Sequence, residues 1–217
     1  MAKVAVVLSG CGVYDGAEIN EAVLTLLALE RQGATYQCFA PNIPQLHVIN
    51  HLTGEPVPGD TRNVLVEAAR IARGKIKDVA EAKAADFDAL LVPGGFGAAK
   101  NLSDFAVNGA QMTVQKDFLQ FAKDMHKAGK PIGLICIAPT MAAKICGAGA
   151  ASTIGNDKDT AAAIEAMGGR HIVCPVNKAV VDEANKLVST PAYMLANKVS
   201  EAADGIEDCV KKVLALI

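Results

Sequence analysis

The chain has 217 residues, of which 51% are hydrophobic and 20% are charged. A chain of this length usually forms one domain, and its apolar content can offset the entropy of folding, which excludes a disordered segment, a collagen-like repeat and a small disulfide scaffold. The formal net charge of −2 argues against nucleic-acid binding, because that function needs a basic face.

The N-terminal segment predicts neither a membrane span nor an export signal. Its apolar run at residues 4–8 is far shorter than the roughly 20 residues that a span requires, and no cleavage site follows it. The six cysteines are scattered without a C-x-x-C pair, which is typical of buried thiols, or of one reactive thiol, in a reducing compartment. We therefore expect a cytoplasmic protein that contacts no membrane and uses no metal or other cofactor.

Apolar, β-branched runs alternate along the chain with longer stretches of helical period. This alternation predicts βα units around a mainly parallel sheet. The expected strands are 4–8, 35–39, 89–92 and 131–135, followed by a pair at 171–181 and 186–190. The expected helices are 19–31, 62–73 with Asp60-Thr61 as its cap, 114–127, one opened by Pro139, 157–167 and 192–217. An excursion at 45–57 interrupts the pattern, but no linker does, so residues 1–217 are predicted to form one α/β domain.

The strongest chemical signal is the junction at Cys136. A buried strand is expected to end there, and Ile137-Ala138-Pro139 then opens a helix, which resembles a nucleophile elbow. A helix N-terminus beside the sulfur would lower the pKa of the thiol. The alternative is an inert buried cysteine. The position of Cys136 at the turn, outside the strand, favours a reactive thiolate.

Glycines follow the strand at 89–92. If this loop lies beside Cys136, the N–H groups of Gly95 and Ile137 would form an oxyanion hole, and Gly94 would border the substrate. Glu18 follows the first strand at the same sheet edge, where a lone glutamate is usually a helix-dipole residue. The sequence 9–16 departs from G-x-G-x-x-G because Asp15 replaces the third glycine, so a nucleotide site is not expected.

Two further residues are candidates for the substrate pocket. His51, in the excursion, could reach the crevice or be a hydrogen-bonded structural histidine. Asn156 lies in the segment that follows the predicted elbow helix.

The motifs together resemble the class I glutamine amidotransferase-like superfamily, in particular its parkinsonism-associated deglycase and PfpI peptidase group. Within that group the chain is most similar to the enhancing lycopene biosynthesis family, also called the glyoxalase ElbB family. The similarity covers essentially the whole chain. It is carried by Leu8-Ser9-Gly10-Cys11-Gly12-Val13-Tyr14-Asp15-Gly16, Val48-Ile49-Asn50-His51-Leu52-Thr53-Gly54-Glu55, Pro93-Gly94-Gly95-Phe96-Gly97-Ala98-Ala99-Lys100-Asn101-Leu102 and Cys136-Ile137-Ala138-Pro139.

The resemblance implies a flavodoxin-like three-layer α/β/α sandwich that forms a homodimer. It also implies an elbow nucleophile at Cys136, a carboxyl partner at Glu18, and oxyanion N–H groups at Gly95 and Ile137. In glyoxalase-type relatives the thiolate attacks the aldehyde of methylglyoxal or glyoxal, and the hemithioacetal becomes a 2-hydroxy acid without glutathione. The implied function is thus a weak glyoxalase that acts on a small dicarbonyl substrate.

The chain departs from the superfamily pattern at its histidines. The segment 152–157 lacks the histidine that deglycase-type relatives carry after the elbow, and Thr190-Pro191-Ala192-Tyr193 lacks the His-x-Glu of amidotransferases. Turnover would then depend on Glu18, or on His51, and we expect it to be slow because a positioned base contributes about 100- to 10,000-fold. Two alternatives are a non-catalytic redox-sensing or regulatory protein linked to isoprenoid metabolism and a small-molecule amidase.

Overall fold

A seven-stranded sheet forms the centre of the computed structural model, which describes residues 1–217. The strands lie in the order β10-β11-β7-β6-β1-β2-β5. Their bounds are β1 Lys3–Val7, β2 Thr35–Ala40, β5 Ile76–Asp78, β6 Ala89–Val92, β7 Ile132–Ile135, β10 Val180–Asp182 and β11 Leu187–Thr190. All neighbours pair in parallel except β10 and β11, so the predicted mainly parallel sheet is confirmed.

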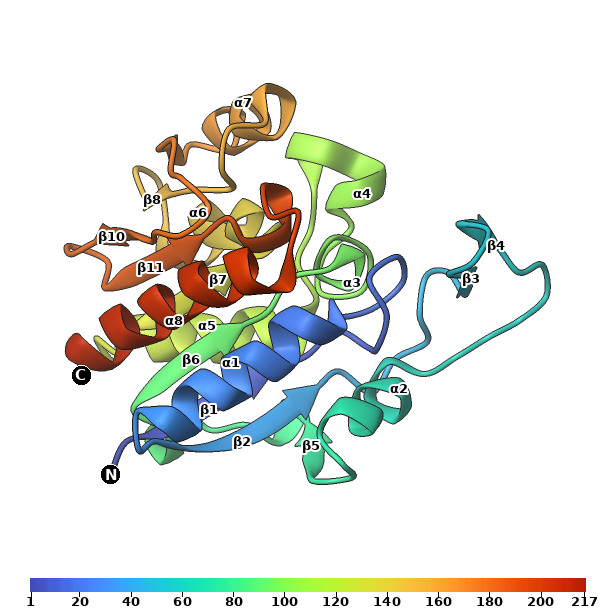
Figure 1. Ribbon diagram of the computed structural model, residues 1–217, viewed down its shortest axis with the longest axis horizontal. Helices are drawn as coiled ribbons and strands as arrows, with labels where there is room; N and C mark the ends of the chain where they lie inside the picture. The colour runs from blue at the N-terminus through green and yellow to red at the C-terminus, as the bar shows by residue number, and fades with distance from the viewer.

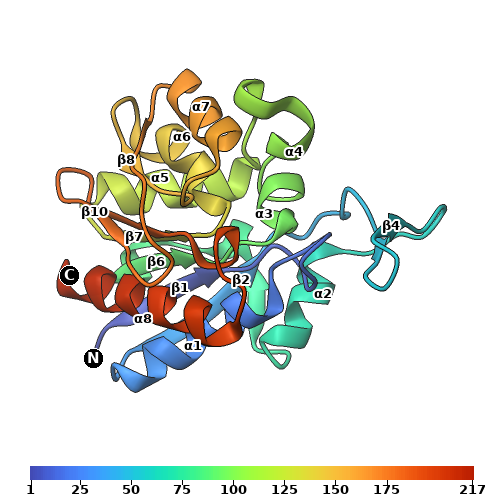
Figure 2. The same ribbon diagram turned by 45° about the horizontal axis from the view of Figure 1, so that its top comes forward.

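Helices cover both faces of this sheet (Figure 2). On one face α1 (Ile19–Arg31), α2 (Val64–Ile71) and α8 (Val199–Ala215) contribute to one buried apolar cluster. On the other face α5 (Lys116–Lys127) and α6 (Ala142–Cys146) contribute to a second cluster. The predicted flavodoxin-like three-layer α/β/α sandwich is therefore confirmed.

The remaining elements are short. The helices are α3 (Phe96–Lys100), α4 (Phe105–Asn108) and α7 (Lys158–Ala166). The small strand pairs are β3 (Ile49–Asn50) with β4 (Glu55–Pro56), and β8 (Ala151–Ser152) with β9 (Arg170–His171). The 3-10 turns are Val79–Glu81, Ala84–Asp86, Gly109–Gln111, Ala138–Met141 and Ala192–Met194. The predicted excursion is the β3–β4 hairpin, which projects from the body of the molecule (Figure 1).

Several predicted boundaries are wrong for local reasons. Asn63, not Asp60-Thr61, caps α2, because its side chain accepts a hydrogen bond from the Val66 N–H at 3.1 Å. The strand β5 was not predicted. Most of 171–181 is irregular, and Pro175 within it lacks a ladder donor. The last helix begins at Val199, since a corner with Ala192 at φ 43° interrupts the apolar pattern before it.

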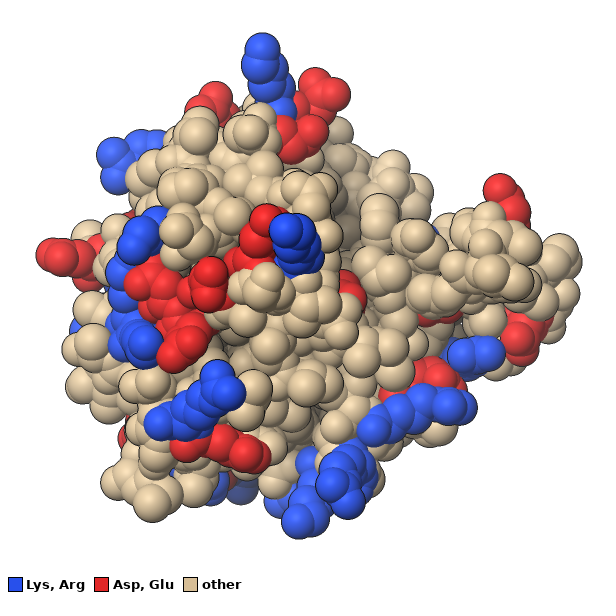
Figure 3. Space-filling view, viewed as in Figure 1, with Lys and Arg blue, Asp and Glu red and all other residues tan.

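The surface of the molecule carries mixed charge. Acidic side chains are interspersed with lysines and arginines on the face drawn in Figure 3. Along α8, Lys211 pairs with Glu207 and Lys212 pairs with Asp208, each one helical turn away. No helix is both long enough and apolar enough to span a bilayer.

The topology brings three loops to one edge of the sheet. Because β1, β6 and β7 are parallel neighbours, their carboxyl ends point to the same side. From β1 the chain goes to β2 on one side and later returns to β6 on the other, which makes this edge a topological switch point. Ligands of open α/β sheets bind at such points.

We predict that Gly205→Ala destabilises the fold, although Gly205 lies inside α8. Helix propensity alone would favour alanine by about 1 kcal/mol. A Cβ at this position, however, would overlap the backbone oxygen of Val176 and lie 2.8 Å from Thr190 Oγ1. We expect the free energy of unfolding in urea to fall by about 1–3 kcal/mol. The exposed neighbour Asp204→Ala should change it by less than about 0.5 kcal/mol, and a stabilised Gly205→Ala protein would contradict this packing.

Candidate active site

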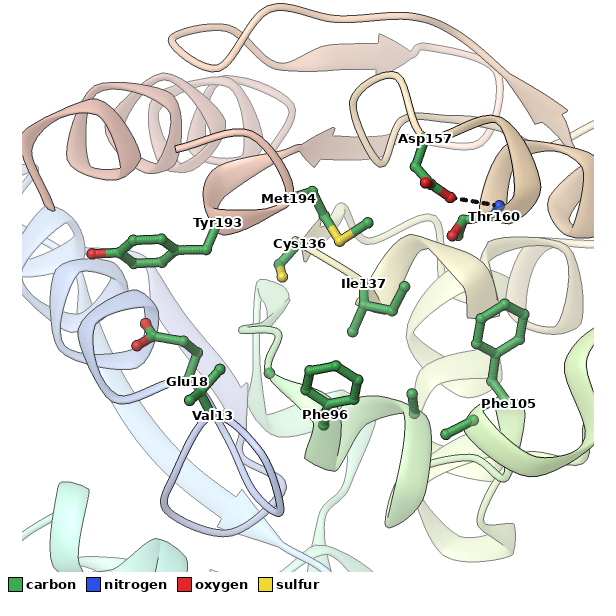
Figure 4. A pocket seen from close by; sticks show the side chains of 13 residues that line it. Val13, Glu18, Phe96, Phe105, Cys136, Ile137, Asp157, Thr160, Tyr193 and Met194 are labelled. Atoms are coloured by element: carbon green, nitrogen blue, oxygen red, sulfur yellow. Dashed lines mark hydrogen bonds between the residues drawn. The ribbon is translucent and has the colours of Figure 1, made fainter. Parts of the chain in front are cut away.

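A cavity of about 490 Å³ opens at the carboxyl edge of β1, β6 and β7 (Figure 4). Nine of its thirteen lining residues are hydrophobic, and none is histidine. The lining residues are Val13, Glu18, Gly95, Phe96, Ala99, Phe105, Ala106, Cys136, Ile137, Asp157, Thr160, Tyr193 and Met194. The cavity thus combines one thiol and two carboxyl groups with a largely apolar wall.

Cys136 occupies a strained turn directly after β7. Its φ is 64°, a left-handed conformation that is rare for residues other than glycine, and its N–H donates to the Thr190 oxygen at 2.9 Å. The backbone N–H groups of Gly95 and Ile137 lie beside its sulfur and favour the thiolate. The turn leads into the 3-10 segment Ala138–Met141, with Pro139 in its first positions. The sulfur therefore lies between two backbone donors, while their role as an oxyanion hole stays a prediction.

The two glycines after β6 are required by close packing. A Cβ on Gly94 would overlap the Cβ of Cys136 and lie 2.8 Å from Glu21 Oε2. Gly95 has φ 89°, and a Cβ there would overlap the backbone of Glu18. The prediction that Gly94 borders the substrate is therefore wrong. Gly94 does not line the cavity but packs against Cys136 and Glu21.

Glu21, which the sequence analysis missed, is the carboxyl group that contacts Cys136. The residue has no exposed surface, and its side chain lies beside that of Cys136, since a Cβ on Gly94 would meet both. Oε2 accepts from the Gly94 N–H at 3.0 Å, and Oε1 accepts from the Tyr193 N–H at 3.1 Å. Burial raises the pKa of Glu21 to about 8, although the two N–H donors oppose this shift. Glu21 is therefore mostly a neutral acid at neutral pH.

The pKa of Cys136 is raised, not lowered as the sequence predicted. Burial is the main cause, and the charge of an ionised Glu21 adds to it. Hydrogen bonds from Gly95 and Ile137 act in the opposite direction but are the smaller effect. The donors at the elbow can be inferred from the sequence around Cys136, whereas the desolvation and the buried carboxyl group come from segments far along the chain. At rest the pair is a thiol beside a carboxylic acid.

Glu18 lines the same cavity as Cys136 but does not take the position that the resemblance gave it. Its Oε2 accepts from the Glu21 N–H at 2.6 Å, which caps α1, and its Oε1 accepts from Asn20 Nδ2 at 3.4 Å. The carboxyl beside the sulfur instead comes from the first turn of α1. Burial raises the pKa of Glu18 as well. Glu18 therefore presents its carboxyl group to the cavity from the cap of α1, whereas Glu21 does not line the cavity.

His51 and Asn156 do not reach the cavity. His51 Nε2 accepts from the Tyr14 N–H at 3.2 Å, its Nδ1 lies 3.1 Å from the Ile49 oxygen, and its ring stacks on Tyr14. These contacts make it a structural histidine of the excursion. Asn156 is exposed, and its neighbour Asp157, the cap of α7, lines the cavity in its place.

Glu21 could have been found from its helical phase. It shares the buried face of α1 with Thr25 and Leu29, at intervals of one turn. A glutamate in phase with a core face predicts a buried, hydrogen-bonded carboxyl group. The sequence carries no comparable signal for Tyr193, Met194 and Phe105.

The structure contains no group of three or more His, Cys, Asp or Glu side chains placed to bind a metal ion.

We predict that Glu21→Gln shifts the alkylation of Cys136 to lower pH. The substitution removes the charge that opposes thiolate formation, and one unit of pKa corresponds to about a tenfold higher thiolate fraction. Above about pH 8, where Glu21 is ionised, the rate of iodoacetamide modification should thus rise roughly tenfold, as measured by peptide mass mapping. At neutral pH, where Glu21 already holds its proton, the rate should change little. Glu30→Gln, on the exposed end of the same helix, should leave the profile unchanged. A slower reaction of the Glu21→Gln protein would show that the carboxyl promotes the thiolate.

Comparison with known proteins gives the context of this site. The model of the DJ-1/PfpI family matches residues 3–191. The human glutamine amidotransferase-like class 1 domain-containing protein 3, mitochondrial, is 52% identical over 99% of this chain and 83% of its own length. The rat ES1 protein homolog, mitochondrial, is 51% identical over 99% of this chain and 84% of its own length.

Solved structures agree with this assignment. An isoprenoid biosynthesis protein with an amidotransferase-like domain from Ehrlichia chaffeensis is 38% identical, with a TM-score of 0.93 over 100% of this chain and 99% of its own. Drosophila melanogaster DJ-1beta, at 19% identity, shares only the fold, with a TM-score of 0.55 over 100% of this chain and 96% of its own. The family model matches most of this chain, and the relatives are similar to it over nearly its full length. The chain therefore belongs to the DJ-1/PfpI family.

Proposed function

We propose that the protein is a glutathione-independent glyoxalase that converts methylglyoxal or glyoxal to the corresponding 2-hydroxy acid. The observation that carries this proposal is the arrangement around Cys136. A thiol with two N–H donors and a neutral Glu21 beside it faces a cavity that Glu18 also lines. Adding a thiol to an aldehyde and moving one proton between adjacent carbons requires these groups and no separate oxidant.

The first step is the addition of Cys136 to the aldehyde. The sulfur forms a bond to the aldehyde carbon, the C=O π electrons move to oxygen, and the thiol proton ends on that oxygen to give a neutral hemithioacetal. The N–H groups of Gly95 and Ile137 would stabilise the negative charge that develops on oxygen. Because no net charge is formed, the raised pKa of the buried thiol is compatible with this step.

The second step moves a proton from the former aldehyde carbon to the neighbouring ketone carbon. Glu18 is the proposed base, since its burial raises its pKa toward the range in which a carboxyl can both accept and return a proton. The electron pair left by the proton forms a C=C bond, the ketone π electrons move to the ketone oxygen, and that oxygen takes the hydroxyl proton of the hemithioacetal. Return of the proton from Glu18 to the former ketone carbon, with a C=O bond forming at the former aldehyde carbon, gives a thioester of the 2-hydroxy acid. Water then cleaves the thioester, releasing the acid and restoring the Cys136 thiol.

The alternatives are less well supported by the site. In an amidase a histidine paired with the nucleophile usually activates it and then protonates the leaving amine, and no histidine lines this cavity. A redox sensor needs an accessible thiol of low pKa, whereas Cys136 is buried and its pKa is raised. The name of the Ehrlichia chaffeensis relative is the one observation that favours a regulatory role in isoprenoid metabolism, which stays the second candidate.

The homodimer and the cytoplasmic location remain predictions, and the human and rat relatives are named as mitochondrial proteins.

We predict that methylglyoxal turnover without glutathione is lost in Cys136→Ala. In Glu18→Gln it should fall about 100- to 10,000-fold, because glutamine keeps the shape of the side chain but cannot carry the proton. Formation of the 2-hydroxy acid should be followed by chromatography. Cys146→Ala, at a partly exposed cysteine outside the cavity, is the control and should retain wild-type turnover. Equal rates for Cys136→Ala and the wild-type protein would refute the proposed function.

A further inference from the structure

We infer that this site takes an α-oxoaldehyde with an extended apolar substituent in preference to methylglyoxal. The inference rests on the proposed function, since it assigns the substrate class of the same site. Methylglyoxal carries a single methyl group beside its two carbonyls. The cavity has about 490 Å³, within the roughly 300–1,000 Å³ typical of pockets that enclose ligands of drug size. A small dicarbonyl would leave most of it to water.

The cavity is polar on one side of Cys136 and apolar on the other. Figure 4 shows Glu18 and Tyr193 together on one side of the sulfur, and Ile137 and Phe105 on the opposite side. A dicarbonyl bonded to Cys136, with its carbonyls toward Glu18, would therefore direct its substituent along Ile137. We call this second part, formed by Phe96, Ala99, Phe105, Ala106 and Ile137, the apolar arm.

The apolar arm presents hydrophobic surface without a partner. Phe96, the first residue of α3, is 49% exposed, and Phe105 of α4 is partly exposed. The small side chains of Ala99 and Ala106 leave the space between these rings open. An apolar substituent would remove both rings from water, and each buried methylene group would increase kcat/KM about fourfold.

The polar groups at the mouth of the arm do not oppose such a ligand. The carboxylate of Asp157 accepts the Thr160 N–H at 2.8 Å and caps α7. The Thr160 side chain and this N–H both lower the pKa of Asp157. Asp157 is exposed, so its charge remains hydrated beside a bound substituent. A polar rim around an apolar interior is the usual design of a small-molecule site.

The test is a chain-length series of alkylglyoxals, from methylglyoxal to pentylglyoxal, with kcat/KM measured for each. We expect kcat/KM to rise about fourfold per methylene group for the wild-type protein. Phe105→Ser should flatten this dependence, because it removes one wall of the arm. Val107→Ser is the matched control: Val107 lies on the same helix, is 65% exposed and does not line the cavity, so the dependence should persist. Comparing ratios within each variant separates substrate preference from losses of folded protein.

A second measurement does not require turnover. Heptan-2-one should slow the alkylation of Cys136 by iodoacetamide, acetone should not, and Phe105→Ser should abolish the protection. If methylglyoxal turnover depends on Cys136 but neither kcat/KM nor protection varies with chain length, the apolar arm is refuted while the proposed function stands. If turnover is independent of Cys136 but heptan-2-one protects, the proposed function fails and the arm remains an apolar binding site. Equal protection in Phe105→Ser and Val107→Ser would refute the arm in either case.

Discussion

The buried contact between Glu21 and Cys136 is the interaction on which the site depends. Through its two oxygens Glu21 binds the N–H groups of Gly94 and Tyr193, and it thereby connects α1 to the loops that follow β6 and β11, while Cys136 ends β7. Two residues with positive φ, Cys136 and Ala192, lie at this junction. Such backbone conformations cost roughly 1–3 kcal/mol each and persist where surrounding contacts hold them, as the Glu21 hydrogen bonds do here.

Burial decides the charge of this pair. An ionised carboxyl group without a cationic partner costs several kcal/mol in the interior, and Glu21 takes part in none of the ion pairs of the structure. Holding the proton avoids that cost, which is why the pKa of Glu21 rises to about 8. A neutral acid can then accompany Cys136 through addition to an aldehyde, in which no net charge develops. A site of this kind favours carbonyl substrates over chemistry that needs a resting thiolate.

The sequence was informative wherever the signal is local. The apolar runs at β1, β6 and β7 and the strand-to-helix junction at Cys136 predicted the sheet and the elbow, because each depends on a few adjacent residues. Contacts between distant segments were not predictable in the same way. The approach of the Tyr193 N–H to Glu21 depends on how the β11 loop packs against α1, and the sequence of neither segment contains it.

The reactivity of this site depends on Glu21 being a neutral acid at neutral pH. Carbon-13 NMR of glutamate side-chain carboxyl groups measures this directly, with the Glu21 signal assigned by its loss in Glu21→Gln. We expect a carboxylic acid signal at neutral pH that titrates with an apparent pKa of about 8. A Glu21 signal that titrates in the ordinary range of glutamate, near 4.3, would show that the carboxylate is ionised beside Cys136 and would rule out the neutral acid.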